Sequence, residues 1–261
     1  MTISSHHAVT LQQLMESSRG DTLGPQLSQM IEGLENPSKI AHITFHNIRL
    51  DSRQVTTNEV FVLLQSQLKN CQKSREYLSQ AAKKAAFILS EIDPLALFAG
   101  SDRQLDATQP SAEQQLAALP CPIIYVPNIR EFLGELIQAC LQFQQPVPLP
   151  TVVAVTGTNG KTTISQLVAQ LTQLAGMSSA VMGTAGNGRL GALVQASHTT
   201  GDVLAVQQFL YQMGQEGAEI LALEASSHGL DQQRLQGMPV KIAIYTNLSR
   251  DHLDYHADMA E

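Results

Sequence analysis

The sequence predicts a two-domain α/β protein with a mostly parallel sheet in each domain. Short β-branched runs alternate with longer amphipathic segments through both halves of the chain, which is typical of parallel sheets covered by helices. Between the halves, residues 144–150 contain three prolines, which stop a helix or a central strand from crossing this segment. We therefore place the domain boundary there, with one domain over residues 1–145 and a second over residues 146–261.

The first half is expected to contain short strands at residues 61–64, 86–89 and 122–126, with helices over residues 75–85 and 129–143. The stretch from Glu91 to Pro120 is rich in Asp, Gln, Ser, Ala and Pro. It is expected to form a variable loop or insertion that can hold a short helix. In the second half, strands are expected near residues 151–155, 179–183, 219–224 and 241–248, with helices after residue 160 and around 203–216.

Charge and composition exclude several classes of protein. A formal net charge of -7 and a pI near 5.6 argue against binding to nucleic acid or to an anionic membrane. The N-terminus lacks a secretory pattern and no apolar run is long enough to span a bilayer, so we expect a cytoplasmic protein. Cys71, Cys121 and Cys140 lack metal-ligand or redox spacing and are interpreted as buried thiols.

The most informative stretch is TVVAVTGTNGKTT at residues 151–163, which combines a buried-strand pattern with a glycine-bearing turn and a lysine. A helical pattern follows it, and Gly176 supplies the stop. Its apolar positions are Ile164, Leu167, Val168, Leu171, Leu174 and Ala175. Strand, loop and helix are thus in the order that a phosphate cradle needs.

Each residue type in this loop suits phosphate binding. Gly157 and Gly160 let backbone amides approach an anion, and the free N–H groups at the start of the helix add a favourable dipole. Lys161 would reach the terminal phosphates and Thr162 offers a hydroxyl to Mg²⁺. The strict P-loop pattern needs a glycine where the chain has Val155, so an ordinary strand–turn–helix with a solvated lysine is the alternative.

The loop and two later blocks resemble a known family. VTGTNGKTT at residues 155–163 is similar to the ATP-binding signature of the Mur ligases and the related folylpolyglutamate synthetases. EASSHGLDQQR at 224–234 and TNLSRDHLDYH at 246–256 resemble the Mur ligases that add the third residue of the peptide stem. Residues 180–188 and 199–201 fit the same members in the same order.

A shorter match lies in the first half, where LDSR at 50–53 and NEVFV at 58–62 are similar to the uridine-binding domain of those Mur ligases. The resemblance therefore runs from about residue 49 to residue 261. It implies an N-terminal α/β domain that binds a UDP-linked precursor, followed by a Rossmann-like P-loop ATPase domain. Of that second domain the chain is expected to hold only the first part, and the family's C-terminal domain is expected to be absent.

The activity that the resemblance implies is an ATP-dependent ligation. The carboxylate of UDP-MurNAc-L-Ala-D-Glu attacks ATP to give an acyl phosphate, and an amino acid then forms the amide, with Mg²⁺ as cofactor. The region around residues 180–188 favours meso-diaminopimelate over lysine as that amino acid. A monomer is expected. The isolated chain is expected to be nearly inactive in ligation, because an acyl phosphate needs shielding from water and an amine placed beside it.

The resemblance also implies roles for individual residues. The ATP-binding set is Gly157, Thr158, Asn159, Gly160, Lys161, Thr162 and Thr163. The residues implied for Mg²⁺ are Thr162, Glu224 and His252, and those implied for catalysis are Lys161, Glu224 and His252. Leu50 and Ser52 are implied for the uridine end, and His198, Thr199, Thr200, Ser226, Gln232 and Arg234 for the sugar-peptide end. From the pattern alone, Glu224 ends an apolar strand, so its carboxylate should emerge at the carboxyl edge of the sheet, where such folds bind ligands.

Two departures from the family pattern argue against tight binding of the UDP-linked precursor. Residues 65–74 lack the glycines and the Asp-Gly pair that family members carry there, and His198 stands where an asparagine is usual. A non-catalytic homologue that binds ATP or the precursor is therefore a second hypothesis. A different P-loop NTPase or kinase is a third, which the blocks at 224–234 and 246–256 disfavour.

Overall fold

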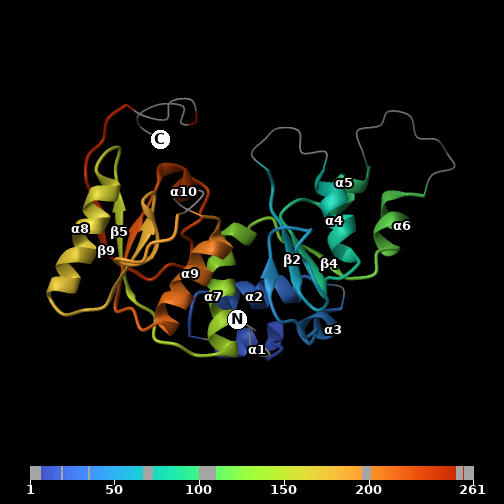
Figure 1. The fold of residues 1–261 in the computed structure, drawn as a ribbon. Coiled ribbons are helices and arrows are strands. Elements are labelled where there is room, and N and C mark those ends of the chain that lie inside the picture. Colours follow the sequence, from blue (N-terminus) through green and yellow to red (C-terminus); the bar gives the residue numbers. More distant parts are fainter. Residues whose placement is uncertain are drawn as a thin grey trace. The chain divides into compact units, whose positions relative to one another are not determined.

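A computed structural model of the chain describes residues 7–18, 20–34, 36–66, 73–99, 110–195, 201–250 and 255. The chain divides into two compact units, Met1–Gln144 and Gln145–Glu261. Figure 1 shows a sheet with associated helices in each unit. Both units are mixed α/β structures, as the alternation of strand and helix patterns predicts.

Unit 1 contains a four-stranded parallel sheet in the order β1-β2-β3-β4. The strands are β1 (Ile48–Arg49), β2 (Val60–Leu63), β3 (Phe87–Ser90) and β4 (Ile123–Tyr125). All residues of β2 and β3 are buried, which explains why these strands are apolar except for Ser90. Because the strands are parallel, their carboxyl ends lie along one edge of the sheet.

The helices of unit 1 are α1 (Leu11–Ser17), α2 (Leu23–Glu32), α3 (Pro37–Ala41), α4 (Ser74–Ala82), α5 (Pro94–Ala99), α6 (Ala112–Ala117), the 3₁₀ turn η1 (Ile129–Glu131) and α7 (Leu133–Gln144). Thr10 and Ser111 begin α1 and α6 with capping boxes, each closed by a glutamine three residues later. Two short helices, α5 and α6, lie within the stretch predicted to be a variable loop with a short helix.

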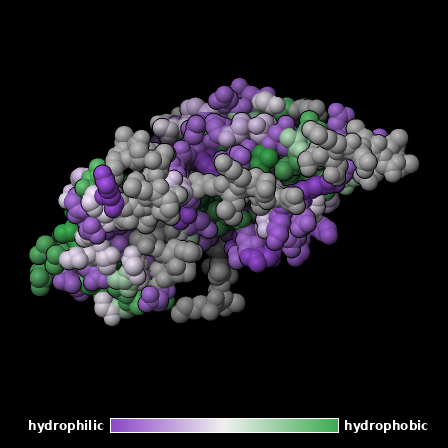
Figure 2. All heavy atoms as spheres, turned by 90° about the horizontal axis from the view of Figure 1, so that it is seen from above, coloured by the Kyte–Doolittle hydropathy of each residue, from purple (hydrophilic) through white to green (hydrophobic). Residues whose placement is uncertain are grey.

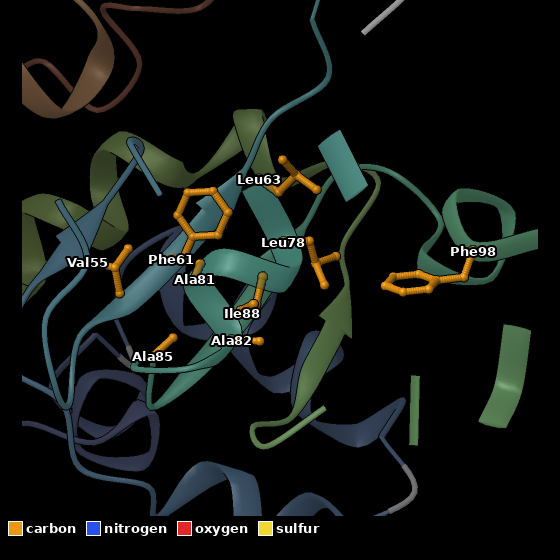
Figure 3. Packing of buried hydrophobic residues seen from close by; sticks show 9 residues of the cluster. All are labelled: Val55, Phe61, Leu63, Leu78, Ala81, Ala82, Ala85, Ile88 and Phe98. Carbon is orange, nitrogen blue, oxygen red and sulfur yellow. The ribbon is translucent and has the colours of Figure 1, made fainter. Parts of the chain in front are cut away.

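Helix α4 packs against the sheet through small residues, as Figure 3 shows. Ala81 and Ala82 let the helix approach β2 and β3 closely, where Phe61 and Ile88 fill the space beside Leu78. Phe98 of α5 belongs to the same cluster. This core holds the sheet in place, and the predicted uridine-binding residues Leu50 and Ser52 follow its strand β1.

Unit 2 contains a five-stranded sheet in the order β7-β6-β8-β5-β9, parallel except for the β6–β7 hairpin. The strands are β5 (Thr151–Thr156), β6 (Ser179–Gly183), β7 (Gly186–Arg189), β8 (Ile220–Glu224) and β9 (Val240–Tyr245). The helices are α8 (Lys161–Leu174), α9 (Val203–Gln215) and α10 (Ser227–Asp231).

Alternate residues of β8 face different helices. Leu221 and Leu223 pack with Leu210 of α9, whereas Ala222 packs with Ala169 of α8. Small side chains between α8 and the sheet bring this helix close, so the loop at its N-terminus lies directly above the ends of β5 and β8. That closeness positions the candidate site.

Part of the apolar pattern of α8 is not buried. Leu167, Leu171 and Leu174 are 44%, 64% and 85% exposed, because Ser165 and Ala169 form the buried side of the helix. Figure 2 shows exposed hydrophobic residues at the left edge of the molecule, the side on which Figure 1 draws α8. Helical spacing therefore located the helix correctly, although it did not identify which side meets the sheet.

Several elements differ from the sequence prediction. The strand expected over residues 241–248 ends at Tyr245, because after the bonds from Thr246 to Thr156 at the end of β5 the following hydrogen bonds go to the loop before α8. The helix expected over residues 75–85 ends at Ala82. Strand β7 was not predicted, since its GNGR sequence has little strand character. Among the described residues, no helix is both long and apolar enough to cross a membrane.

Candidate functional site

The glycine-bearing loop joins the central strand β5 to α8. Val155 is fully buried and pairs with Glu224 on one side and Ile244 on the other. A residue at that position is part of the sheet and not of the loop, which explains why no glycine is needed there. The loop proper begins at Gly157, whose φ of +126° is a conformation that glycine adopts readily.

Gly157 is also required for close packing. A Cβ atom at this residue would lie 2.2 Å from Thr246 Oγ1 and 2.7 Å from the carbonyl oxygen of Asn247. At the other end of the loop, Gly160 has a φ of +86° and forms the N-cap of α8. The first N–H groups of a helix have no carbonyl partner within it, so those of the first turn are available to an anion.

Lys161 lies over the loop that precedes it. Its Nζ donates to the carbonyl oxygens of Gly157 at 2.7 Å and Thr158 at 3.1 Å. These two bonds hold the ammonium at the start of α8, where it adds positive charge to the positive end of the helix dipole. The side chain is thus placed at the predicted phosphate site and is not extended into solvent.

Two amides of the expected nest are engaged elsewhere. The N–H of Thr158 donates to the carbonyl oxygen of Asn247 at 2.9 Å, and the N–H of Asn159 donates to Asn247 Oδ1 at 3.1 Å. In this conformation the nest consists of the amides from Gly160 to Thr163. It is therefore smaller than the stretch of 157–163 that the sequence predicts.

Glu224 lies at the carboxyl end of β8 and is only 1% exposed. Thr162 Oγ1 donates to its Oε2 at 2.9 Å, so the carboxylate is joined directly to the first turn of α8. The backbone N–H of Thr184 donates to Oε1 at 2.9 Å, and the Thr184 hydroxyl donates to Oε2 at 3.2 Å. Gly183 makes room for the side chain, because a Cβ there would lie 2.1 Å from Oε1.

The Thr162–Glu224 pair offers a hydroxyl and a carboxylate, which are the hard oxygen donors that Mg²⁺ prefers. The donor chemistry at the mouth of the nest therefore fits a magnesium ion. Among the described residues, there is no group of three or more His, Cys, Asp or Glu side chains placed to hold a metal ion. His252, predicted as a further ligand, lies outside the described residues, as do the predicted substrate residues His198, Thr199 and Thr200.

The block at 224–234 forms a local network beside this site. Ser226 caps α10 by accepting the N–H of Gly229 at 3.1 Å, so part of its role is structural. Arg234 Nε donates to Gln232 Oε1 at 2.9 Å, and Gln232 Nε2 donates to the Tyr255 hydroxyl at 3.1 Å. Tyr255 in turn donates to Asp231. The two sequence blocks that carry the resemblance thus meet in space.

In unit 1 the predicted uridine residues occupy the segment after β1. Leu50 is half-buried, and Ser52 is 7% exposed with its hydroxyl donating to Gln80 Oε1 at 3.0 Å. Of the segment 65–74 that departs from the family, residues 67–72 lie outside the described residues. The N–H of Gln65 donates to Glu91 Oε2 at 2.6 Å, and Arg130 donates to the carbonyl oxygen of Gln65 at 2.8 Å.

Three site residues were not singled out from the sequence. Gly183 and Thr184 contact Glu224, and Asn247 bonds to the loop. The available signal was their position in the chain, since Gly183 ends one parallel strand, Thr184 follows it, and Asn247 follows another. Side chains at the carboxyl ends of neighbouring parallel strands meet at one edge of the sheet.

Known proteins resemble this chain in sequence and in fold. Residues 155–261 match the family model of the Mur ligase middle domain. Over most of its length, this chain is homologous to Mur ligases. The match extends well before the loop, because the aligned relatives cover more than four-fifths of the chain.

The similar curated proteins are UDP-N-acetylmuramoyl-L-alanyl-D-glutamate--2,6-diaminopimelate ligases. The one from Vibrio vulnificus is 39% identical over 221 residues, which are 85% of this chain and 41% of the relative. The one from Haemophilus ducreyi is 40% identical over 220 residues, 84% of this chain and 42% of the relative. The one from Coxiella burnetii is 33% identical over 237 residues, 90% and 44% of the two chains. The chain thus spans about two-fifths of the length of these relatives.

Solved structures show the same relationship. A structure of a UDP-N-acetylmuramoyl-L-alanyl-D-glutamate--2,6-diaminopimelate ligase matches with a TM-score of 0.71 and 37% identity, covering 89% of this chain and 42% of that one. MurF from Acinetobacter baumannii matches with a TM-score of 0.53 and 18% identity, covering 97% of this chain and 44% of that one. The second likeness concerns the fold alone.

Proposed function

We propose that unit 2 binds MgATP as part of an ATP-dependent amide ligase. The Thr162–Glu224 contact carries this proposal, because it places a hydroxyl and a buried carboxylate at the mouth of the amide nest. The ammonium of Lys161 lies beside the same loop, at the start of α8. The nest amides and the Lys161 ammonium would neutralise part of the phosphate charge. Thr162 and Glu224 would hold a magnesium ion that neutralises the remaining phosphate charge.

The proposed reaction joins an amino acid, meso-diaminopimelate, to UDP-MurNAc-L-Ala-D-Glu through an acyl phosphate. It is supported by the names of the relatives and by the blocks at 224–234 and 246–256. Arg234, held by Gln232, has a planar fork suited to a carboxylate or diphosphate. The proposal includes a monomer located in the cytoplasm, as the family resemblance implies.

The protein's own contribution to this chemistry is placement and charge neutralisation. The substrate carboxylate and the γ-phosphate repel each other, and the nest amides with Lys161 lower that repulsion. Magnesium, held by Thr162, Glu224 and the proposed ligand His252, would supply further positive charge. Domain 1–145 is proposed to hold the uridine end, through Leu50 and Ser52.

A direct assay separates ligation from binding alone. The purified chain is incubated with UDP-MurNAc-L-Ala-D-Glu, ATP, Mg²⁺ and diaminopimelate, and products are identified by mass spectrometry. Tripeptide formation that disappears in Lys161→Ala but persists in Lys241→Ala supports the ligase, since Lys241 is an exposed lysine on β9. Nucleotide binding without product supports the ATP site; it is the result expected of the isolated chain, and a non-catalytic homologue would give it too. Absence of nucleotide binding contradicts both.

A further inference from the structure

The segment that follows β9, Thr246–Ser249, is hydrogen-bonded along the phosphate loop, and we call it the clasp. The N–H of Thr246 donates to the carbonyl oxygen of Thr156 at 3.0 Å, and the N–H of Thr158 donates to that of Asn247 at 2.9 Å. The N–H of Ser249 donates to the Thr158 hydroxyl at 2.8 Å. The clasp therefore continues the β5–β9 pairing beyond the sheet and onto the loop.

Asn247 makes an additional two-point contact with one loop residue. Its Oδ1 accepts the N–H of Asn159 at 3.1 Å, and its Nδ2 donates to the carbonyl oxygen of Asn159 at 3.0 Å. Thr246 Oγ1 donates to the same carbonyl at 2.7 Å. A side-chain amide offers a donor and an acceptor side by side, which neither a carboxylate nor an aliphatic side chain provides.

This contact determines which way each peptide of the loop points. In a planar trans peptide, the carbonyl of one residue and the N–H of the next point in opposite directions. The carbonyls of Gly157 and Thr158 face Lys161 Nζ, so the amides of Thr158 and Asn159 face the clasp. At Asn159 the order reverses: its carbonyl faces the clasp, and the next amide, that of Gly160, points away from it.

We infer that Asn247 is a positioning residue that sets the orientation of the Gly160 amide, the first donor of the phosphate nest. The inference rests on the proposed nucleotide binding at this loop. Gly160 has a φ of +86°, and glycine can rotate about its backbone more freely than other residues. Without Asn247 the carbonyl of the Asn159–Gly160 peptide would keep only its bond from Thr246 Oγ1, and the N–H of the preceding peptide would lose its acceptor. A nest whose donors are already oriented binds an anion more tightly than one that must order them.

The Gly160 amide can be observed directly by NMR. The sequence contains two Asn-Gly pairs, Asn159–Gly160 and Asn187–Gly188. Labelling asparagine with carbonyl ¹³C and glycine with ¹⁵N therefore selects these two amides. Titration with magnesium tripolyphosphate should shift the Gly160 signal of the wild-type chain and leave the Gly188 signal in place. In Asn247→Ala, the apparent affinity should fall by about tenfold to a hundredfold, as expected for loss of two hydrogen bonds.

Two further variants complete the test. Thr246→Val removes the second donor to Asn159 while keeping the shape of the side chain, and a loss of roughly threefold to tenfold is expected. Thr246→Val also replaces Asn247→Ala as the test variant if Asn247→Ala does not fold. Leu248→Ala alters a 63%-exposed clasp residue and should bind as the wild type does. A wild-type Gly160 signal that ignores the probe overturns the nucleotide site together with this inference. A wild-type shift with unchanged affinity in Asn247→Ala, or in Thr246→Val if the former is unfolded, overturns the positioning role alone.

Discussion

Gly183→Ala should displace the Glu224 carboxylate without straining the backbone. The new Cβ would lie 2.1 Å from Oε1 and 2.5 Å from Cδ of Glu224. Since non-bonded carbon atoms settle at about 3.5 Å, the carboxylate must move by roughly 1 Å. Such a movement would break its 2.9 Å bond from the Thr184 N–H or its 2.9 Å bond from the Thr162 hydroxyl.

The expected cost combines two effects. Overpacking of a filled site costs roughly 1–3 kcal/mol, and loss of a hydrogen bond to a charged group adds about 1.5–3 kcal/mol. We expect unit 2 to lose about 3 kcal/mol of stability, which would speed hydrogen exchange in β6 and β8 by roughly a hundredfold. Exchange measured by mass spectrometry on peptides from these strands reports unit 2 separately from unit 1.

A double-mutant cycle isolates the contact. In a Glu224→Ala background the obstructing side chain is gone, so Gly183→Ala should cost less than about 1 kcal/mol, a coupling of about 2 kcal/mol. Equal costs of Gly183→Ala in the two backgrounds would show that the glycine does not make room for Glu224. Faster hydrogen exchange confined to β7 would also contradict a clash between residue 183 and Glu224.

Two other predictions concern unit 1. Glu59→Gln should destabilise this unit by about 2 kcal/mol, because the buried carboxylate loses its charge-assisted bond from Arg49 at 2.7 Å. Burial would raise the Glu59 pKa, but hydrogen bonds from Arg49 and from the backbone outweigh it and leave that pKa below 4.5. The difference in the free energy of unfolding between variant and wild type should therefore be present above about pH 4.5 and vanish as pH falls further. Urea titrations monitored by hydrogen exchange measure this difference. A stability difference that persists in acid would contradict the prediction. Burial raises the pKa of Cys140 to about 12 and that of Cys121 to about 11, so iodoacetamide should label Cys121 of the folded chain about tenfold faster, and labelling of Cys140 first would oppose the account.

Local patterns predicted the elements that position the site. The apolar run of β5, the glycines after it and the helical spacing of α8 lie within one contiguous segment, so their order could be read directly. The placement of Glu224 followed from a general rule, because the last residue of an apolar strand emerges at the carboxyl edge of a parallel sheet. The structure adds that this carboxylate is buried and hydrogen-bonded to Thr162.

Contacts between distant residues could not be predicted in the same way. Asn247 bonds to Asn159 across 88 residues, and neither residue type distinguishes such a contact from an ordinary turn. The strand pattern of residues 241–248 gave the wrong end for β9 for the same reason. Thr246 and Asn247 resemble a strand continuation in sequence, but beyond the bonds from Thr246 to Thr156 their hydrogen bonds go to the phosphate loop.

Above all, we propose that Thr162 and Glu224 bring magnesium to a nucleotide held at the start of α8. Calorimetric titration of a non-hydrolysable ATP analogue, with and without Mg²⁺, tests it in the wild-type chain and in Glu224→Gln. Mg²⁺ should strengthen nucleotide binding to the wild-type chain by at least about tenfold, and Glu224→Gln should remove most of this gain. An equal magnesium effect in both chains, or no nucleotide binding by the wild type, would contradict it.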